Sequence, residues 1–329
     1  MELRIQPLDR VLSISPGANL LEVLREHQIP VSYSCMAGRC GTCRCKVLAG
    51  DVLDTGREMR RPQDGEEATV LACQTVLGTS CTIEIPEPDE VVVHPARVLK
   101  ATVASIEPLT HDIRRLRLTS TRPLDFSPGQ YANLQFGPTL ARPYSMAGLP
   151  GDDALEFHVR LVAGGRVTGH IAQALAVGDA VRVSGPLGSA YLRRKHTGPM
   201  LCVAGGTGLA PILAIVRGAL EGSMRNPIHV YCGARSPRDI YGMAWLQALQ
   251  RDHANLQVHA VVASDAPAAG QRTGLVTDAI AQDWPDLGGW RAYLCGSPPM
   301  VEAASLLARQ RGMAPAHIHA DAFYPGVLA

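Results

Sequence analysis

Three closely spaced cysteines limit what this chain can fold into more than any other feature of its sequence. Cys35, Cys40 and Cys43 follow the spacing C-x4-C-x2-C, and Cys73 comes after 29 further residues. In a [2Fe–2S] site of the plant type, one loop supplies three thiolates and a distant segment supplies the fourth. Glycines within the loop would let its backbone approach a cluster and turn N–H groups toward the sulfur atoms. The spacing therefore predicts a [2Fe–2S] cluster bound by these four cysteines.

Two other uses of the cysteines fit less well. Structural zinc sites usually combine one Cys pair with a second pair or with two histidines, and here a single distant ligand follows the loop. A disulfide framework is typical of short secreted chains, whereas this chain has 329 residues and an odd number of cysteines, nine. The remaining cysteines near strand-like sequence are expected to be packed thiols rather than ligands: Cys45, Cys81, Cys202 and Cys232.

The overall composition excludes several classes of protein. The chain has 31 Lys and Arg against 30 Asp and Glu, without the basic excess of a nucleic-acid-binding protein. It has no signal-peptide-like apolar stretch at its start and no apolar run long enough for a membrane span. We therefore expect no nucleic-acid or membrane partner and a cytoplasmic location, where thiols stay reduced.

The sequence pattern changes twice along the chain and predicts three domains, at residues 1–93, 94–195 and 196–329. The first is acidic, with nine Lys and Arg against fourteen Asp and Glu, whereas the remainder has 22 against 16. Residues 2–14 read as two short strands, and Asn19 followed by Glu22 predicts a capped helix from Leu20 to about His27.

The second and third parts differ in the spacing of their apolar residues. Short alternating runs from about Arg97 to Arg193, separated by turn residues, predict an antiparallel β-barrel. From Met200 onward, apolar strands alternate with helical segments, as in a parallel sheet covered by helices on both faces. The expected strands are residues 200–205, 227–233, 258–264 and 291–296. The expected helices begin at Leu209 and lie over 248–252, 275–281 and 301–310.

Two motifs in the barrel region could bind a phosphorylated cofactor. The first is ARPYS, with Arg142, Tyr144 and Ser145, because an Arg can bind phosphate and a Tyr can stack on a flavin ring. The second combines residues 158–160 (HVR) with residues 164–168 (GGRVT), which lead to a helix expected to start near Thr168. The N–H groups at a helix start bind anions.

Two further motifs lie at strand ends of the third part. Residues 204–211 (AGGTGLAP) follow an apolar strand and precede a helix, which is the setting of a phosphate-binding turn, although a plain tight turn would fit the same residues. Residues 293–298 (YLCGSP) end a later strand, at the edge where open parallel sheets bind ligands.

Taken together, these motifs resemble the ferredoxin–NADP reductase superfamily with a plant-type ferredoxin domain fused in front. HPAR, THDIRRL, FSPGQYA, RPYSMAGLP and HTGPMLC are most similar to the reductase components of naphthalene and nitroarene dioxygenase systems. The resemblance implies a β-grasp [2Fe–2S] domain, an antiparallel barrel that binds FAD and a parallel-sheet domain that binds NAD. It also implies an NADH-dependent flavin iron–sulfur oxidoreductase, with NADPH as the other possible donor.

The resemblance implies roles for particular residues. Ser145 and Cys295 would lie at the reacting centre. The residues it implies for FAD are Arg142, Tyr144, Ser145, His158, Val159, Arg160, Gly165, Val167 and Thr168. The residues it implies for the pyridine nucleotide, with Phe323 as a cover for the flavin, are Gly206, Thr207, Gly208, Pro211, Cys295 and Gly296. Arg235 and Arg238, in GARSPRD after the second strand of the third part, could bind the 2′-phosphate of NADPH, and they could equally bind ribose or water.

The resemblance also implies an electron acceptor. Electrons would leave the cluster for a Rieske-type ferredoxin that serves an aromatic-ring dioxygenase. Reductases of monooxygenase, salicylate hydroxylase and deoxysugar dehydrase systems share the domain order, so these acceptors stay open. The aromatic substrate and the oligomeric state leave no trace in this sequence.

Overall fold

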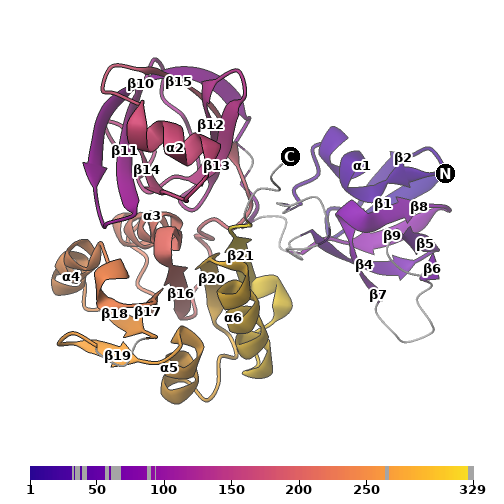
Figure 1. The fold of residues 1–329 in the computed structure, drawn as a ribbon. Helices are drawn as coiled ribbons and strands as arrows, with labels where there is room; N and C mark the ends of the chain where they lie inside the picture. Colours follow the sequence, from indigo (N-terminus) through magenta and orange to yellow (C-terminus); the bar gives the residue numbers. More distant parts are fainter. Residues whose placement is uncertain are drawn as a thin grey trace. The chain divides into compact units, whose positions relative to one another are not determined.

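The computed structural model describes residues 1–31, 33, 38, 43–55, 59–60, 68–86, 90–92, 94–263 and 267–324, with the side chains of 59 and 60 left out. The chain divides into two compact units, Met1–Val93 and His94–Ala329 (Figure 1). Among the helices in these ranges, none is long and apolar enough to cross a membrane.

The first unit contains two β-sheets and one α-helix. The larger sheet has the order β2 (Arg10–Ser13), β1 (Glu2–Gln6), β9 (Cys81–Glu84), β4 (Arg44–Ala49), β7 (Ala68–Leu71), with β1 and β9 parallel. The smaller has the order β3 (Ala18–Asn19), β8 (Thr75–Leu77), β5 (Val52–Asp54), β6 (Met59–Arg60), and a 3-10 turn, η1 (Ala72–Gln74), precedes β8. A mixed sheet crossed by one helix is the predicted β-grasp arrangement.

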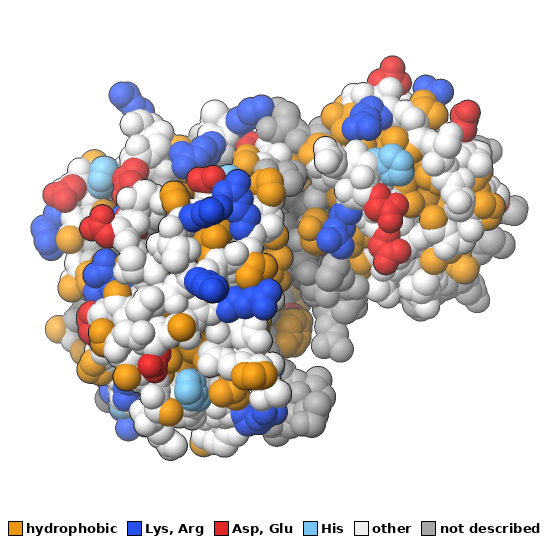
Figure 2. Space-filling view, turned by 90° about the horizontal axis from the view of Figure 1, so that it is seen from above, with side chains coloured by type: hydrophobic (Ala, Val, Ile, Leu, Met, Phe, Trp, Pro, Cys, Tyr) orange, Lys and Arg blue, Asp and Glu red, His pale blue; other side chains and the backbone are white. Residues whose placement is uncertain are grey.

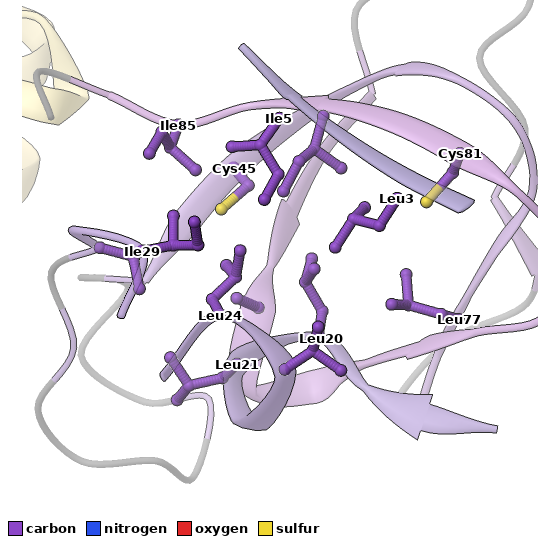
Figure 3. Close-up of a cluster of buried hydrophobic side chains, with 14 of the residues drawn as sticks. Leu3, Ile5, Leu20, Leu21, Leu24, Ile29, Cys45, Leu77, Cys81 and Ile85 are labelled. Atoms are coloured by element: carbon purple, nitrogen blue, oxygen red, sulfur yellow. The ribbon is translucent and has the colours of Figure 1, made fainter. Parts of the chain in front are cut away.

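Helix α1 (Leu20–Glu26) forms as the sequence predicts. The Asn19 side chain accepts a hydrogen bond from the Glu22 N–H at 3.2 Å and so satisfies one of the free donors of the first turn. Leu20, Leu21 and Leu24 are buried in one apolar cluster with Leu3 and Ile5 of the sheet (Figure 3). This apolar face fixes the helix on the sheet.

The second unit begins with the predicted antiparallel barrel. Its sheet has the order β13 (Leu140–Ser145), β12 (Tyr131–Gly137), β15 (Ala180–Leu187), β10 (Arg97–Pro108), β11 (Ile113–Ser120), β14 (Leu155–Arg160). A bridge between Met146 and Phe157 joins the two edges and nearly closes the barrel. Helix α2 (Arg166–Gln173) contacts β13 and begins two residues before the predicted start.

A parallel six-stranded sheet completes this unit. Its order is β19 (Gln271–Thr273), β18 (Leu256–Val262), β17 (Ile228–Ala234), β16 (Met200–Gly205), β20 (Arg291–Gly296), β21 (Ile318–Ala322). Helices α3 (Leu209–Glu221) and α4 (Met243–Asp252) pack on one face, and α5 (Val276–Asp283) and α6 (Pro298–Gln310) on the other (Figure 1). This confirms the predicted parallel sheet. The sequence did not indicate β19 and β21.

Helix α3 also packs against the barrel. A Cβ at Gly218 would lie 2.6 Å from Pro128 Cγ, so the small residue allows close approach. Arg217 donates two hydrogen bonds to Asp152, at 2.8 and 2.9 Å, and Asp152 also accepts the Leu149 N–H. Apolar packing and a bidentate ion pair thus join the barrel to the parallel sheet.

Candidate functional site

The expected cluster ligands Cys43 and Cys73 lie side by side in the first unit. Cys43 directly precedes β4, and Cys73 is in η1, where its N–H points to the Cys43 sulfur at 3.5 Å. The Ala72 N–H also donates to the Cys43 carbonyl at 2.8 Å. These two contacts hold the segments that carry Cys43 and Cys73 together. Cys35 and Cys40 lie outside the described residues.

The surroundings of Cys73 fit a bound cluster. Asn19 donates to the Cys73 carbonyl at 3.1 Å, so the helix cap also fixes the fourth ligand. The Gln74 amide lies 3.9 Å from the Cys73 sulfur. Gly38 has φ +74°, and a Cβ there would come within 2.8 Å of the Gln74 side chain, so a larger residue at 38 would collide with Gln74. The local donors and the close approach suit thiolates that carry negative charge.

The other described cysteines are packed thiols, as predicted. Cys45 and Cys81 point into the core of the first unit, where burial raises their pKa to about 12 and about 11 (Figure 3). Cys202 and Cys232 are buried in the parallel sheet, where burial raises the pKa of Cys232 to about 12. The cysteines within the described ranges form no disulfide. These thiols stay protonated and are poor metal ligands.

Strand β13 carries the ARPYS residues at the edge of the barrel. Arg142 is exposed, whereas Tyr144 and Ser145 are partly buried. Burial raises the pKa of Tyr144 to about 12, an effect that the nearby Arg142 partly offsets. An exposed guanidinium beside an aromatic ring that remains neutral suits the phosphate and the ring of a flavin nucleotide.

The HVR residues on β14 face different ways. Val159 points into the barrel core with Phe157. The His158 side chain is fully buried, and both of its ring nitrogens have partners in the protein, Tyr241 and Glu156. Arg160 reaches the turn at Gly206 and forms an ion pair with Asp112 at 3.3 Å. At 158 and 159, therefore, only the backbone is available to a cofactor.

The start of α2 forms an open hollow on the barrel. Gly165 is the N-cap, and the Thr168 hydroxyl accepts the Val162 N–H at 3.2 Å, which shapes the loop before the helix. The hollow has a volume of about 540 Å³ and is lined by residues 161–166, 168–170 and 172–174. Val167 is buried toward the barrel, so its contribution here is its backbone. Free N–H groups at the helix start suit a pyrophosphate.

The turn after β16 has glycines at two positions where an added side chain would be crowded. A short 3-10 turn, Gly206–Gly208, contains Thr207 and leads into α3, where Pro211 is buried. Gly206 has φ +55°, and a Cβ there would come within 2.8 Å of the Arg160 guanidinium. A Cβ at Gly208 would overlap the Cys295 carbonyl. The turn leaves its backbone N–H groups at the carboxyl end of the sheet, where nucleotides bind.

The ends of β20 and β21 bring the expected reacting residues together. Cys295 is fully buried and pairs in register with Asp321, and the Ser145 hydroxyl donates to Asp321 at 3.4 Å. Burial raises the pKa of Asp321 to about 6, although the Ser145 hydrogen bond opposes the shift. Burial also raises the pKa of Cys295 well above its usual value, so its thiol stays neutral. Asp321 was not predicted from the sequence, because its neighbours come from β13 and β20.

Two further predicted residues follow strands at the same carboxyl edge of the parallel sheet. The Phe323 N–H donates to the Gly296 carbonyl at 2.8 Å, which fixes the segment after β21 beside the end of β20. Arg235 lies after β17, in a loop held by Asp239, which accepts the Ser236 N–H and hydroxyl at 3.0 and 2.7 Å. A ligand at the ends of β16 and β17 would meet this loop.

Three family profiles match consecutive parts of the chain. The 2Fe-2S iron-sulfur cluster binding domain matches residues 3–78, the oxidoreductase FAD-binding domain 100–191, and the oxidoreductase NAD-binding domain 202–305. These matches agree with the neighbouring Cys43 and Cys73, with the hollow at the start of α2 and with the turn Gly206–Gly208. They confirm [2Fe–2S], FAD and NAD(H) as the cofactors. The protein is an NAD(P)H-dependent flavin iron–sulfur oxidoreductase.

Full-length relatives narrow this class. The chain is 60% identical to a naphthalene 1,2-dioxygenase/salicylate 5-hydroxylase systems ferredoxin–NAD(P)+ reductase component of Ralstonia sp., covering 99% of both chains. It is 57% identical to that of the naphthalene 1,2-dioxygenase system of Pseudomonas putida, also with 99% coverage of both. The solved cytochrome P450 reductase GcoB of Amycolatopsis has a TM-score of 0.73 and 34% identity, covering 98% of this chain and 99% of that one. The chain belongs to the family of these ferredoxin–NAD(P)+ reductase components, as its motifs predicted.

Proposed function

We propose that this protein takes electrons from NADH and delivers them to a Rieske-type ferredoxin of an aromatic-ring dioxygenase system. The single observation that carries the proposal is the identity of 60% and 57%, over the whole chain, to reductase components of naphthalene 1,2-dioxygenase systems. When bound, FAD accepts two electrons as a hydride and passes them on one at a time, which suits a one-electron cluster.

The residues of the second unit would hold and orient the two nucleotides. Arg142 and Tyr144 would bind the flavin phosphate and ring, and the N–H groups near Gly165 and Thr168 would bind its pyrophosphate. The turn Gly206–Gly208 would receive the pyridine nucleotide beside Arg160, with Pro211 and Arg235 as further contacts.

The chain's own groups at the reacting centre would control protons and water. Ser145, Asp321 and Cys295 would border the atoms that exchange the hydride, and the hydroxyl of Ser145 would remain a donor toward Asp321. Phe323, tied to Gly296, would cover the flavin until the nicotinamide arrives. Cys35, Cys40, Cys43 and Cys73 would bind the cluster, within domains at 1–93, 94–195 and 196–329.

Charge supports an electrostatic contribution to partner binding. Lys and Arg side chains gather in patches on the larger unit, in keeping with its net positive charge, whereas residues 1–93 are acidic (Figure 2). An acidic cluster domain would attract the basic surface of a ferredoxin in a weak, transient encounter. We further propose a reducing compartment, the cytoplasm, since the proposed cluster needs four of the nine cysteines as thiolates, and these persist where disulfides do not form.

A second acceptor system has a specific observation in its favour. The 60% identical relative serves both a naphthalene 1,2-dioxygenase and a salicylate 5-hydroxylase system. We propose salicylate hydroxylation as the alternative destination of the electrons.

Reconstitution separates the two destinations. The purified protein, NADH and a Rieske-type ferredoxin are combined with either the dioxygenase and naphthalene or the hydroxylase and salicylate. NADH oxidation coupled to the naphthalene diol supports the first proposal, and salicylate turnover alone supports the second. A matched run with NADPH tests the donor, because a clear preference for NADPH would contradict the choice of NADH.

A further inference from the structure

The outward face of β14 forms the contact between the barrel and the nucleotide-binding part of the chain. Side chains alternate along a strand, so Phe157 and Val159 fill the barrel core while Glu156, His158 and Arg160 point outward. Arg160 lies against the turn at Gly206, and the ring of His158 is fully buried. His158 therefore lies on the same strand face as Arg160, two residues before it.

His158 joins a chain of hydrogen bonds that crosses between the two parts. Its Nε2 lies 3.1 Å from Glu156 Oε1, and its Nδ1 lies 3.0 Å from the Tyr241 hydroxyl. Glu156 accepts a short hydrogen bond of 2.6 Å from Arg115, with Arg117 Nε at 3.9 Å. Within the part of the chain that the structure describes, these are the polar contacts of the Glu156 and His158 side chains.

The charges along the chain fix the direction of each hydrogen bond. Burial favours the protonated form of Glu156, but hydrogen bonds from His158 and Arg115 outweigh it and hold its pKa below the usual value. Burial lowers the pKa of His158, although Glu156 opposes this, so the ring is neutral near pH 7. A carboxylate can only accept, so Nε2 carries the proton and Nδ1 accepts from the Tyr241 hydroxyl.

Tyr241 belongs to the loop that borders the expected nucleotide site. With Gly206 and Gly233 it lines the small crevice between the ends of β16 and β17. Gly242, which follows it, has φ +69° and starts α4, and Trp245 of that helix packs on His158 at 5.9 Å between ring centroids. The position of Tyr241 thus sets where this loop lies relative to β14.

We propose that His158 is a positioning residue for the pyridine nucleotide. It accepts a hydrogen bond from the Tyr241 hydroxyl and so holds loop 235–242 against β14. Since Arg160 is on the same face of β14, this hydrogen bond also sets the separation between the Arg160 guanidinium and the Gly206 turn. The inference rests on the proposed binding of NADH at that turn. It differs from the expected contact of His158 with the flavin, because the ring faces the loop.

The mildest test is Tyr241→Phe, which removes the hydroxyl and leaves the ring in place. Stopped-flow reduction of the bound flavin, in the full-length holoprotein over a range of NADH concentrations, gives the dissociation constant of NADH and the limiting rate separately. We expect the dissociation constant of NADH to rise about fivefold. This change corresponds to about 1 kcal/mol, the net contribution of one hydrogen bond. The limiting rate and the flavin spectrum should stay close to those of the wild type, because the reacting centre is unchanged.

A pair of substitutions at 158 tests the direction of the hydrogen bond. The carboxamide oxygen in His158→Asn can lie near the position of Nδ1 and accept from Tyr241. The amide of His158→Gln reaches instead toward Nε2 and Glu156. We expect His158→Asn to bind NADH more tightly than His158→Gln.

Tyr231→Phe is the matched control. The Tyr231 hydroxyl is also buried and hydrogen-bonded, to Asp283 at 2.6 Å, but on the α5 side of the sheet. Tyr231→Phe should lower the free energy of unfolding and leave the dissociation constant of NADH unchanged. Three results would overturn this inference and leave the proposed function standing. They are an unchanged dissociation constant of NADH in Tyr241→Phe, an equal rise of that constant in Tyr231→Phe, and tighter NADH binding by His158→Gln than by His158→Asn. A wild-type protein whose flavin NADH does not reduce would overturn the proposed function and the inference with it.

Discussion

Replacing Asp321 by Asn should make the protein more stable at neutral pH. Burial raises the pKa of this carboxyl from 3.8 to about 6, so its charged form is disfavoured in the folded chain. A difference of one pH unit in pKa corresponds to about 1.4 kcal/mol, so ionised Asp321 costs up to about 3 kcal/mol. An Asn keeps the shape and a hydrogen-bond acceptor for Ser145 but carries no charge.

The sign of the pH dependence follows from proton binding. Between pH 4 and pH 6 the folded chain holds a proton at Asp321 that the unfolded chain has released, so the wild type loses stability as pH rises. The advantage of Asp321→Asn should be absent below pH 4, grow through this window and level off above pH 7.

Urea unfolding at a series of pH values measures this difference. All three tryptophans lie between 245 and 290, so their fluorescence reports on the parallel-sheet part that contains Asp321. Asp252→Asn, at an exposed position at the end of α4, is the control for the loss of an exposed carboxylate. A stability difference for Asp321→Asn that is equal at pH 4 and pH 8, or a loss at pH 8, would refute the reasoning.

Three further predictions concern other parts of the structure. Cys73→Ser should remove the iron–sulfur absorption bands and cytochrome c reduction, while NADH still bleaches the flavin; retention of the bands would contradict the ligand assignment. Gly208→Ala should weaken NADH binding and cost about 1–3 kcal/mol, because the added Cβ overlaps the Cys295 carbonyl; wild-type affinity in flavin reduction would argue against this crowding. Arg217→Met should lower the free energy of unfolding by about 2 kcal/mol, since it leaves Asp152 without its bidentate partner, and an unchanged urea midpoint would oppose this.

The sequence predicted those elements whose signals are local. The capped helix at Asn19 and the change from alternating strands to alternating strand and helix follow from neighbouring residues, and both are confirmed. The proposed cluster ligands also come from a local signal, because cluster chemistry requires a fixed spacing along one loop.

Strands with weak local signals were missed. Strand β13 contains Pro143, which lowers its apparent strand propensity, and the structure places it at the edge of the sheet, where a proline is tolerated. Strand β21 reads IHADA, with little apolar alternation, and forms by pairing with β20.

Within the site, residue types were easier to predict than the direction of their side chains. His158 was expected at the flavin, yet its ring partner Tyr241 lies 83 positions away in the sequence. In the sequence nothing distinguishes Asp321 from other acidic residues, and only the fold places it beside Cys295 of β20 and Ser145 of β13. In both cases tertiary neighbours, rather than spacing along the chain, set the chemistry.

The order of electron flow is most directly tested by rapid freezing after anaerobic mixing with NADH. Samples are examined for flavin bleaching and for the low-temperature paramagnetic signal of a reduced [2Fe–2S] cluster. We expect the flavin to bleach first and the cluster signal to appear afterwards within the same protein, without any added mediator. A fully loaded protein whose flavin is reduced while its cluster stays oxidised, although dithionite reduces it, would contradict the account.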